Sequence, residues 1–232
     1  MMRAFLSLLF LGSTLAIAEI EDEIPLGIEA VTGIRSTYAY RGAKLADTLV
    51  DFQLEAEIVS GKGLVMNAGG WFSSESGGPG FSEFAAFLDV RLDINDLLTI
   101  GASTTYHDFD KAILRDGIDT GIFATFYATE DIDFTFGAYH DFGNDAWYVN
   151  SEASWSPRLG DDAYFGLMGG ISWVDGFIGR SGMNDFYGRA SLTYNINNAV
   201  SLTPFVGWSM LMDSSDPGDD EIFGGLWFEV IF

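Results

Sequence analysis

The stretch GGLWFEVIF, residues 224–232, alternates apolar side chains with small or polar ones at a period of two. The residues on the apolar parity are Leu226, Phe228, Val230 and Phe232. This period predicts a β-strand with one apolar face. Chain ends usually fray into water, so an apolar last residue predicts a final strand whose outer side meets lipid and whose edge pairs with the first strand.

The composition excludes several classes of function. The chain has 232 residues, with 34 acidic residues against 11 Lys and Arg and a formal net charge of −23. Nucleic-acid binding requires a basic face, so this charge argues against it. The absence of cysteine excludes disulfides, a thiol nucleophile and a cysteine metal site. The length fits a single all-β barrel, and the 15 % aromatic residues and 28 glycines are more than an average globular chain contains.

The N-terminus has the pattern of a secretory signal peptide. Arg3 precedes the apolar run 4–11, and Ala16-Ile17-Ala18 forms a small-residue cleavage site. We therefore expect a signal peptide over 1–18, a short periplasmic segment over 19–25 and a barrel over 26–232. No later stretch is apolar for long enough to form a transmembrane helix.

Period-two alternation interrupted by Gly, Asn and Asp clusters predicts twelve strands. They are expected to start near residues 27, 48, 63, 82, 97, 117, 131, 146, 163, 185, 199 and 221. Short connections such as SGKG (60–63) and INNA (196–199) alternate with longer ones such as RGAKLAD (41–47) and VDGFIGRSGMND (174–185). An even strand count with this asymmetry predicts an all-β, antiparallel up-and-down transmembrane β-barrel of about 12 strands.

The two faces of the predicted strands differ in charge. When the more apolar parity of each strand is placed outside, every charged residue within these strands falls on the other parity. Lipid demands an uncharged outer face, because a charge at the bilayer midplane costs about 2–4 kcal/mol for Arg or Lys. The charged residues of the inner parity are Glu29, Arg35, Asp51, Glu55, Glu57, Asp89, Arg91, Asp119, Asp133, Glu152, Arg189 and Glu229.

Aromatic residues of the outward parity gather near the strand ends, as expected for headgroup level. The outer girdle is predicted to contain Tyr38, Phe72, Phe84, Tyr106, Trp147, Trp173, Phe186 and Trp208, and the inner girdle Phe126, Phe134, Trp155, Phe165, Tyr194 and Phe232. A soluble β-sandwich is the alternative, since it also has one apolar and one polar face. It would require neither two aromatic girdles nor an apolar last residue, so the barrel is favoured.

The predicted lumen is polar and acidic. The residues predicted to line a pore are Arg35, Asp51, Glu55, Glu57, Asp89, Arg91, Asp119, Asp133, Glu152, Arg189 and Glu229. One interpretation is a polar interior in which arginines form ion pairs with the carboxylates, so that the charges serve only the structure. The other is a pathway that favours cations, since acidic rings bias a pore toward them. Inward aromatic residues such as Trp71, Phe123 and Tyr187 also take up room, so any channel is expected to be narrow.

Catalytic and metal sites are poorly supported. A lipase would need a Ser–His pair at the lipid face, and His107 and His140 are the only two histidines. The G-x-S-x-G motif does not occur. The loop DSSDPGDDE (213–221) lacks EF-hand spacing and is interpreted as a solvated acidic loop. We expect no enzyme activity, no cofactor and no metal.

The stretch GIRSTYAYRGAKLAD (33–47) resembles the opening of the TorF-like porins, which begin with Ser-x-Tyr-x-aromatic-Arg-Gly. The matching residues are Ser36, Tyr38, Tyr40, Arg41 and Gly42. The order of a signal peptide, a small all-β body and an aromatic end is also similar. This resemblance implies an outer-membrane channel and no particular substrate. The final alternation of Phe228, Val230 and Phe232 resembles the C-terminal assembly signal of bacterial outer-membrane proteins, which the barrel-assembly machinery reads.

These observations together predict a barrel in the outer membrane of a Gram-negative-type bacterium. Its predicted function is that of a narrow porin, which lets small cationic or neutral solutes diffuse passively. The alternative is a structural or adhesive barrel with a filled lumen and acidic external loops. Expected partners are outer-membrane lipids and lipopolysaccharide, the barrel-assembly machinery and small solutes.

Overall fold

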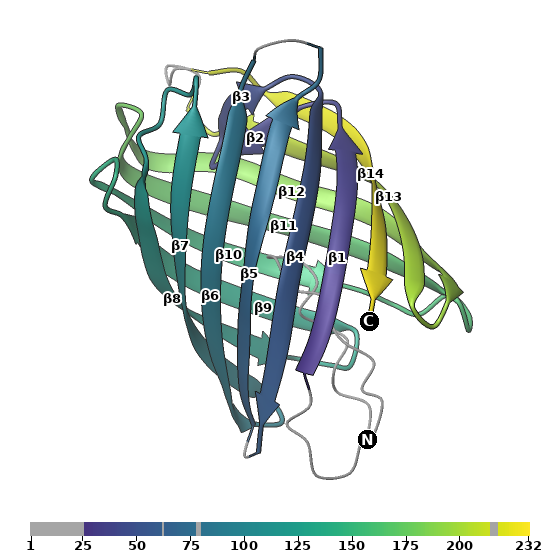
Figure 1. Ribbon diagram of the computed structural model, residues 1–232. Coiled ribbons are helices and arrows are strands. Elements are labelled where there is room, and N and C mark those ends of the chain that lie inside the picture. The colour runs from purple at the N-terminus through teal and green to yellow at the C-terminus, as the bar shows by residue number, and fades with distance from the viewer. Residues whose placement is uncertain (1–25, 62, 78–79, 214–217) are drawn as a thin grey trace.

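The computed structural model describes residues 26–232 except 62, 78–79 and 214–217 (Figure 1). The predicted signal peptide over 1–18 and the periplasmic segment over 19–25 lie outside the described residues and remain expectations. No helix among the described residues is long and apolar enough to cross a membrane.

Twelve antiparallel strands form a closed barrel, which confirms the predicted fold class. Each strand pairs with its neighbours in the chain, and β1 closes the wall by pairing with both β4 and β14. The barrel strands are β1 (Leu26–Arg35), β4 (Leu49–Ser60), β5 (Leu64–Glu75), β6 (Ser82–Asn95), β7 (Leu98–Asp110), β8 (Gly117–Tyr127), β9 (Ile132–Asp141), β10 (Ala146–Trp155), β11 (Ala163–Phe177), β12 (Arg180–Asn197), β13 (Val200–Leu211) and β14 (Glu221–Ile231).

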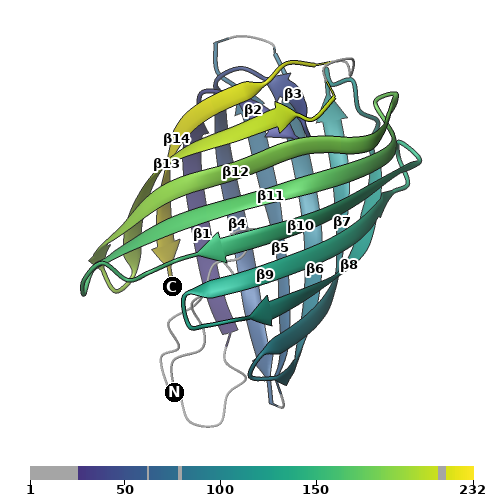
Figure 2. The ribbon, with the colours of Figure 1, turned by 180° about the vertical axis from the view of Figure 1, so that it is seen from behind.

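The strands slope strongly across one side of the wall, as Figure 2 shows for β9 to β13. The end that carries β14's first residues and the longer connections is called the loop end here. The other end, where β1 begins and β14 finishes, is called the turn end (Figure 1). An even number of strands places both ends of the described chain at the turn end.

Two predicted connections are wrong. The loop expected over 174–185 is largely strand, because β11 runs to Phe177 and pairs there with Arg180, the first residue of β12. Ile178 and Gly179, with φ of 52° and 77°, form the tight turn between them. The loop expected over 41–47 contains part of a second small sheet, in which β2 (Tyr38–Tyr40) pairs with β3 (Ala43–Ala46).

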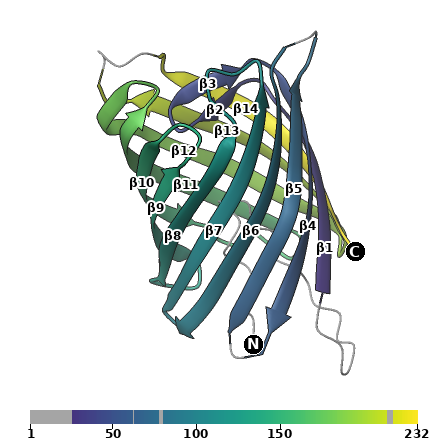
Figure 3. The ribbon, with the colours of Figure 1, turned by 60° about the vertical axis from the view of Figure 1, so that its left-hand side comes forward.

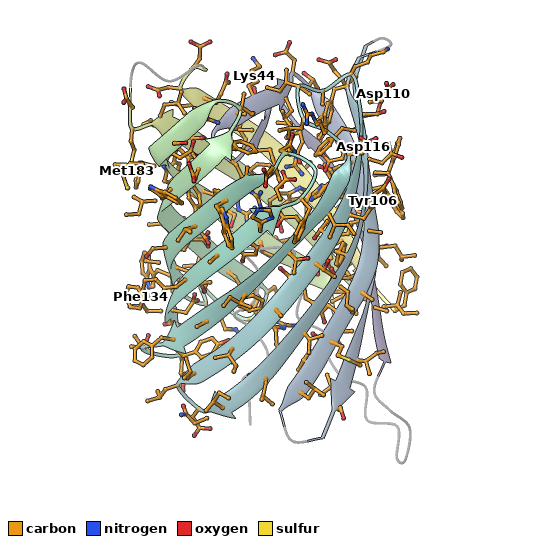
Figure 4. The ribbon with its side chains drawn as sticks, turned by 90° about the vertical axis from the view of Figure 1, so that its left-hand side faces the viewer. Lys44, Tyr106, Asp110, Asp116, Phe134 and Met183 are labelled. Atoms are coloured by element: carbon orange, nitrogen blue, oxygen red, sulfur yellow. The ribbon has the colours of Figure 1, made fainter. Side chains whose placement is uncertain are left out.

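The outer surface of the barrel is apolar. Phe52, Ile122 and Phe136 expose 49 %, 68 % and 55 % of their surface, and their sequence neighbours on the other parity are half-buried or buried. Phe134 and Met183 project from the outside of the wall in Figure 4. A continuous apolar surface of this kind would be unfavourable in water and is what hydrocarbon requires.

Aromatic rings on the inner face lie against glycines of the neighbouring strand. Gly101 is paired directly with Phe123, and Gly121 with Tyr139. A Cβ on Gly101 would lie 2.3 Å from Phe123, and one on Gly121 would lie 2.2 Å from Tyr139. These glycines are therefore required by close approach, and the rings cover the wall where a glycine leaves space. The same direct pairing joins Gly33 with Trp227, Gly69 with Phe87, Gly170 with Tyr187, Gly207 with Phe223 and Gly225 with Phe205.

Candidate functional site

The residues predicted to line a pore all lie on barrel strands, and each has a buried or half-buried side chain. Arg35, Asp51 and Asp119 lie toward the loop end, and Arg189 and Glu152 lie nearer the middle of their strands. Glu55, Glu57, Asp89, Arg91, Asp133 and Glu229 lie in the middle or toward the turn end. The inward direction of these side chains follows from the parity of each strand.

The hairpin formed by β2 and β3 follows the first barrel strand and turns into the barrel. Figures 1 and 3 show it inside the loop end of the wall. Its turn consists of Arg41 and Gly42, with φ of 49° and 76°. Two positive φ values at the central positions are those of a type I′ turn, whose twist matches a short hairpin. A Cβ on Gly42 would lie 3.0 Å from both Arg180 and Asn184, so space as well as φ favours glycine there.

The tip of the hairpin is held by the wall opposite β1 and β4. The Arg41 guanidinium forms an ion pair with Asp119 of β8, and it lies 4.6 Å from the ring centre of Tyr148 on β10. Arg180 Nη2 and Asn184 Nδ2 of β12 each donate a hydrogen bond of 3.1 Å to the Arg41 carbonyl oxygen. The hairpin therefore spans the lumen from one wall to the other.

The Arg180 side chain is 1 % exposed, so its charge is removed from water to hold the hairpin. Its Nη1 also donates to the Gly42 carbonyl oxygen at 3.4 Å. Hydrogen bonds from a charged donor contribute about 1.5–3 kcal/mol each, which is more than a neutral pair provides. Two such bonds at one turn make this contact strong relative to an ordinary loop contact.

The base of the hairpin is held by β6 and β7. The Tyr38 hydroxyl donates to Glu83 Oε2 at 3.1 Å, and Glu83 Oε1 is hydrogen-bonded to His107 Nδ1 at 2.7 Å. The Tyr38 ring contacts Trp71 and Phe81 at centroid distances of 5.6 and 5.7 Å. Tyr38 is 8 % exposed, so its predicted place in the lipid-facing outer girdle is wrong. The chain leaves the strand pattern of β1 before Tyr38, and the residue turns inward with the hairpin.

Two apolar clusters seal the hairpin against the wall. One contains Ala43, Leu114, Ala146, Tyr148, Val174 and Phe177, and the other contains Tyr38, Ala46, Leu49 and Phe81. Phe177 and Leu49 have no exposed surface. Both clusters mix hairpin residues with strand or loop residues of the loop end. The loop end is therefore packed like a protein interior around the hairpin.

A polar network continues below the hairpin. Asp185 accepts hydrogen bonds from Ser172 and from Ser209, the latter at 2.7 Å, and Asn184 donates to Ser172 Oγ at 2.9 Å. All four side chains are buried. This network positions the Asn184 amide that reaches the hairpin, since Asn184 Nδ2 also donates to Asp185 Oδ1 at 2.9 Å.

Arginines lie against aromatic rings both toward the loop end and in the middle of the lumen. Arg35 forms an ion pair with Asp51, and its guanidinium lies 5.9 Å from the ring centre of Trp227. Arg189 approaches the same ring at 4.5 Å, and Trp227 stacks on Phe205 at 4.1 Å. Cation–π contacts of this kind stabilise a guanidinium that has lost water. These contacts agree with the interpretation of a satisfied interior for this level of the barrel.

The wall near the turn end is acidic. Glu29 lies directly opposite Glu55 in the β1–β4 ladder, and Glu57 lies opposite Asn67, which in turn faces Asp89. Arg91 is the cation of this region and donates to Glu57 at 3.1 Å. The Asn67 amide, oriented with its nitrogen toward Glu57, joins Glu57 and Arg91 through contacts of 3.2 and 3.0 Å.

Several residues of the hairpin contact escaped the sequence analysis. Arg180 and Asn184 were assigned to the longer connection expected over 174–185. Arg41 was noted only as part of a resemblance, and Glu83 was not singled out. The dipeptide Arg41-Gly42 could have indicated the tight turn, because glycine readily adopts a positive φ, although Asn-Gly is the commoner sequence at such turns. His140 lies on β9 at the parity of the exposed Phe134 and Phe136, and its ring centre is 4.8 Å from that of Trp147.

Among the described residues, no group of three or more His, Asp or Glu side chains is arranged to hold a metal ion. The lumen is instead a set of carboxylates and guanidiniums on rigid strands. Such an arrangement can bind or exclude charged solutes.

Comparison with solved structures finds small outer-membrane porins. The NanC porin has a TM-score of 0.56 at 9 % identity, covering 88 % of this chain and 98 % of that one. The KdgM porin has 0.55 at 8 % identity, covering 89 % and 98 %. An outer-membrane channel from Pseudomonas putida F1 has 0.55 at 9 % identity, covering 93 % and 100 %. No protein-family model and no curated protein matches the chain.

This likeness is one of fold, spans nearly the whole chain, and agrees with the closed barrel and its apolar outer face. Antiparallel barrels with lipid-facing strands occur in outer membranes, because a closed barrel satisfies every backbone group without water. The chain is therefore an outer-membrane β-barrel with the fold of the small porins.

Proposed function

We propose that this barrel is a narrow outer-membrane channel for small cationic or neutral solutes, whose outer mouth is restricted by the β2–β3 hairpin. The observation that carries the proposal is the charge of the inner wall. Eight of the eleven residues predicted to line the pore are carboxylates, and three are arginines: Asp51, Glu55, Glu57, Asp89, Asp119, Asp133, Glu152 and Glu229 against Arg35, Arg91 and Arg189. Acidic linings attract cations and repel anions.

The substrate is inferred from this lining and not from the similar barrels. The KdgM porin has been captured with disordered oligogalacturonate, which is a polyanion. A polyanion entering this barrel would be repelled by the excess of carboxylates on the inner wall. This repulsion argues against polyanions as the solutes of this protein.

The orientation supports a gate on the outside. Loop ends of outer-membrane barrels face the exterior, and short turns face the periplasm. The TorF-like resemblance covers Tyr40, Arg41 and Gly42, which are the end of β2 and the turn of the hairpin. The resemblance therefore marks the part of the chain that restricts the mouth, and membership in that family is part of the proposal.

The proposed partners follow from the two faces of the wall. Lipid tails and lipopolysaccharide would contact the apolar outer surface. The barrel-assembly machinery would engage β14 through Phe228, Val230 and Phe232, and the signal peptide would direct export.

A second candidate is a structural barrel with a closed lumen. The observation in its favour is the hairpin itself, because its ion pair, hydrogen bonds and two apolar clusters make a closed mouth stable. The two candidates make opposite predictions for a barrel without the hairpin.

The deciding experiment is a planar-bilayer recording of the wild type and of a variant in which a Gly-Ser linker replaces 38–46. A channel gives a small conductance in the wild type and a conductance larger by about an order of magnitude without the hairpin. Its reversal potential in a KCl gradient has the sign of a cation-selective pore. Lys44→Ala is the matched control, because Lys44 lies on the hairpin, is 42 % exposed, and pairs with Asp47 and with Glu221 of the neighbouring β14 at 3.7 Å, not with the opposite wall. If the linker variant shows no conductance either, the protein is a structural barrel and not a channel.

A further inference from the structure

His107 is the histidine that faces the interior of the barrel. The sequence contains two histidines, and His140 lies on the outward parity of β9. His107 lies on β7 near the loop end, where it pairs directly with Ala85 of β6 and Gly117 of β8. Its side chain is 14 % exposed. Imidazole is the side chain that ordinarily changes its charge between about pH 5 and pH 8, so protonation of His107 alters the charge of the loop end in this range.

The imidazole holds the carboxylate that anchors the base of the hairpin. His107 Nδ1 lies 2.7 Å from Glu83 Oε1, and Glu83 Oε2 accepts the hydrogen bond of the Tyr38 hydroxyl at 3.1 Å. Glu83 is 1 % exposed, and its ion-pair partner is His107. A buried carboxylate is costly unless a charge or strong hydrogen bonds offset it. Protonated His107 supplies an opposite charge to Glu83, whereas neutral His107 supplies only an N–H donor.

The imidazole also contacts the hairpin directly. Its ring meets the ring of Tyr40 edge-on at a centroid distance of 5.8 Å and stacks on Phe109 of β7 at 5.3 Å. The Tyr40 hydroxyl is directed away from it, toward Asp119 of β8 at 3.5 Å. His107 is therefore covered by the docked hairpin, and it would meet lumen water if the hairpin left.

Other charged groups face this site from the neighbouring elements, and each is engaged by a partner of its own. They belong to the hairpin turn, to β8, β1 and β4, and to the loop after β7. These groups are Arg41 paired with Asp119, Arg35 paired with Asp51, and the exposed Asp116, which accepts the backbone N–H of Phe109. Protonation of His107 thus changes the charge balance chiefly at Glu83.

We propose that the His107–Glu83 pair makes docking of the β2–β3 hairpin depend on pH, with the docked and restricted mouth favoured by acid. This inference rests on the proposed function, because it concerns the regulation of the same gate. In the docked state the ion pair is removed from water, where opposite charges attract strongly. In the undocked state both groups meet water and their pairing contributes little. The docked hairpin therefore loses stability as the pH rises and His107 becomes neutral.

The test is maleimide labelling of a single cysteine at the base of the hairpin. The chain contains no cysteine, and Ala46 is 5 % exposed and pairs with Tyr38. The folded Ala46→Cys barrel is labelled in detergent at about pH 5.5 and about pH 8, on either side of the ordinary imidazole titration. Each rate is divided by that of Lys44→Cys, which is exposed in the docked hairpin, so that the pH dependence of the thiol itself cancels.

We expect this labelling ratio to rise about five- to tenfold from the lower to the higher pH. The factor is the difference between a hydrogen bond from a charged donor and one from a neutral donor. A ratio that does not change with pH would overturn the proposal.

Glu83→Gln is the sharpest variant, because it should reverse the sign of the pH dependence. A glutamine can accept from the Tyr38 hydroxyl with its oxygen and donate its amide to a neutral imidazole. A protonated His107 would instead be buried beside an uncharged amide, which is unfavourable. The labelling ratio of this variant should therefore be higher at the lower pH. An unreversed profile in a folded Glu83→Gln barrel would count against the pair as the switch.

His107→Gln keeps a neutral donor beside Glu83 and should give the same labelling ratio at both pH values. His140→Gln removes the other histidine, on the outward parity of β9, and is the matched control that should keep the full pH dependence. A pH dependence that survives His107→Gln, or that disappears in His140→Gln, would contradict the proposal. Only variants with heat-modifiable migration on a gel are compared, and if Glu83→Gln does not fold, His107→Gln decides.

The labelling does not require conduction, so this proposal and the proposed function can fail separately. A labelling ratio that depends on pH in a barrel that never conducts would support the switch and refute the channel. A cation-selective conductance in a barrel whose labelling ratio is independent of pH would support the channel and refute the switch.

Discussion

The two ends of the lumen differ in how their charges are satisfied. At the loop end, Arg41 and Arg180 are each matched by a carboxylate or by carbonyl oxygens, and apolar clusters fill the space between them. At the turn end, Glu29 lies directly opposite Glu55, and Arg91 pairs with Glu57. Buried polar atoms without a hydrogen-bond partner among the described residues occur at both ends, such as Asp119 Oδ1 at the loop end and Glu29 Oε2 at the turn end. The difference indicates that the loop end is filled by the chain itself, whereas the wall near the turn end presents carboxylates to the lumen.

Asp119→Ala is expected to have the largest effect on the docking of the hairpin at the loop end. It would leave the Arg41 guanidinium buried without its carboxylate, and breaking a buried pair in this way costs about 3–5 kcal/mol. The hairpin should then undock in most molecules. The chain has no cysteine, so Ala43→Cys, at a buried hairpin position, can report undocking through its rate of maleimide labelling.

The control for this measurement is Lys44→Cys, which is exposed in the docked hairpin and should label rapidly with or without Asp119→Ala. If Ala43→Cys labels no faster in the Asp119→Ala background, the ion pair does not hold the hairpin.

A smaller loss is expected from Asn184→Ala. It removes the 3.1 Å hydrogen bond to the Arg41 carbonyl, but Arg180 still donates to the same oxygen. The cost should be about 1–3 kcal/mol, because Asp185 and Ser172 also lose a donor. Labelling of Ala43→Cys should increase to an intermediate rate. A rate equal to that of Asp119→Ala would show that the two contacts act as one unit.

The wall between the two ends can be tested with Gly121→Val. The new side chain would collide with the Tyr139 ring, 2.2 Å from the position of a Cβ, and would push that ring into the lumen. Overpacking of this kind costs about 1–3 kcal/mol. In the barrel with the linker in place of 38–46, we expect a reduced conductance.

Gly224→Val is the matched control, because a Cβ there would lie 3.4 Å from its nearest atom, which is ordinary contact distance. Equal conductance of the two valine variants would show that the aromatic rings do not border the open path.

The smallest effect is expected from Lys44→Ala. The Lys44 ammonium is hydrogen-bonded to Asp47 at 2.8 Å, a contact that raises the pKa of Lys44 and is fully formed while the amine is protonated. The pair is exposed, so its loss should cost less than about 1 kcal/mol. Labelling of Ala43→Cys should remain close to that of the parent. A marked increase would place part of the hairpin's stability at its solvent-facing edge.

The wall could be predicted from the sequence, whereas the hairpin could not. The start of each strand and the direction of its side chains depend on local alternation. The apolar Phe52 is exposed on the outer face, and the charged Asp51 next to it is buried on the inner face. The inward turn at Tyr38 depends on partners far along the chain, namely Glu83, Asp119 and Arg180. The alternation Tyr38, Tyr40 also continues the pattern of β1, so periodicity alone favoured a longer first strand.

The charge distribution was predicted only in part. The parity of each strand indicated which carboxylates face inward, since a period of two leaves one choice per strand. Which of them are paired depends on register between strands, and Glu29 opposite Glu55 follows from that register. Arg180 could not be recognised as an inner residue, because its strand begins in a stretch with the composition of a loop.

The hairpin's place in the chain has a consequence for how the barrel is made. Arg41 is separated from Asp119 by 78 residues and from Asn184 by 143. The hairpin thus precedes both partners in the chain, and its binding surface exists only when β12 has joined the wall. Docking must therefore follow the incorporation of β12, and until then the hairpin lacks the partners that hold it at the loop end.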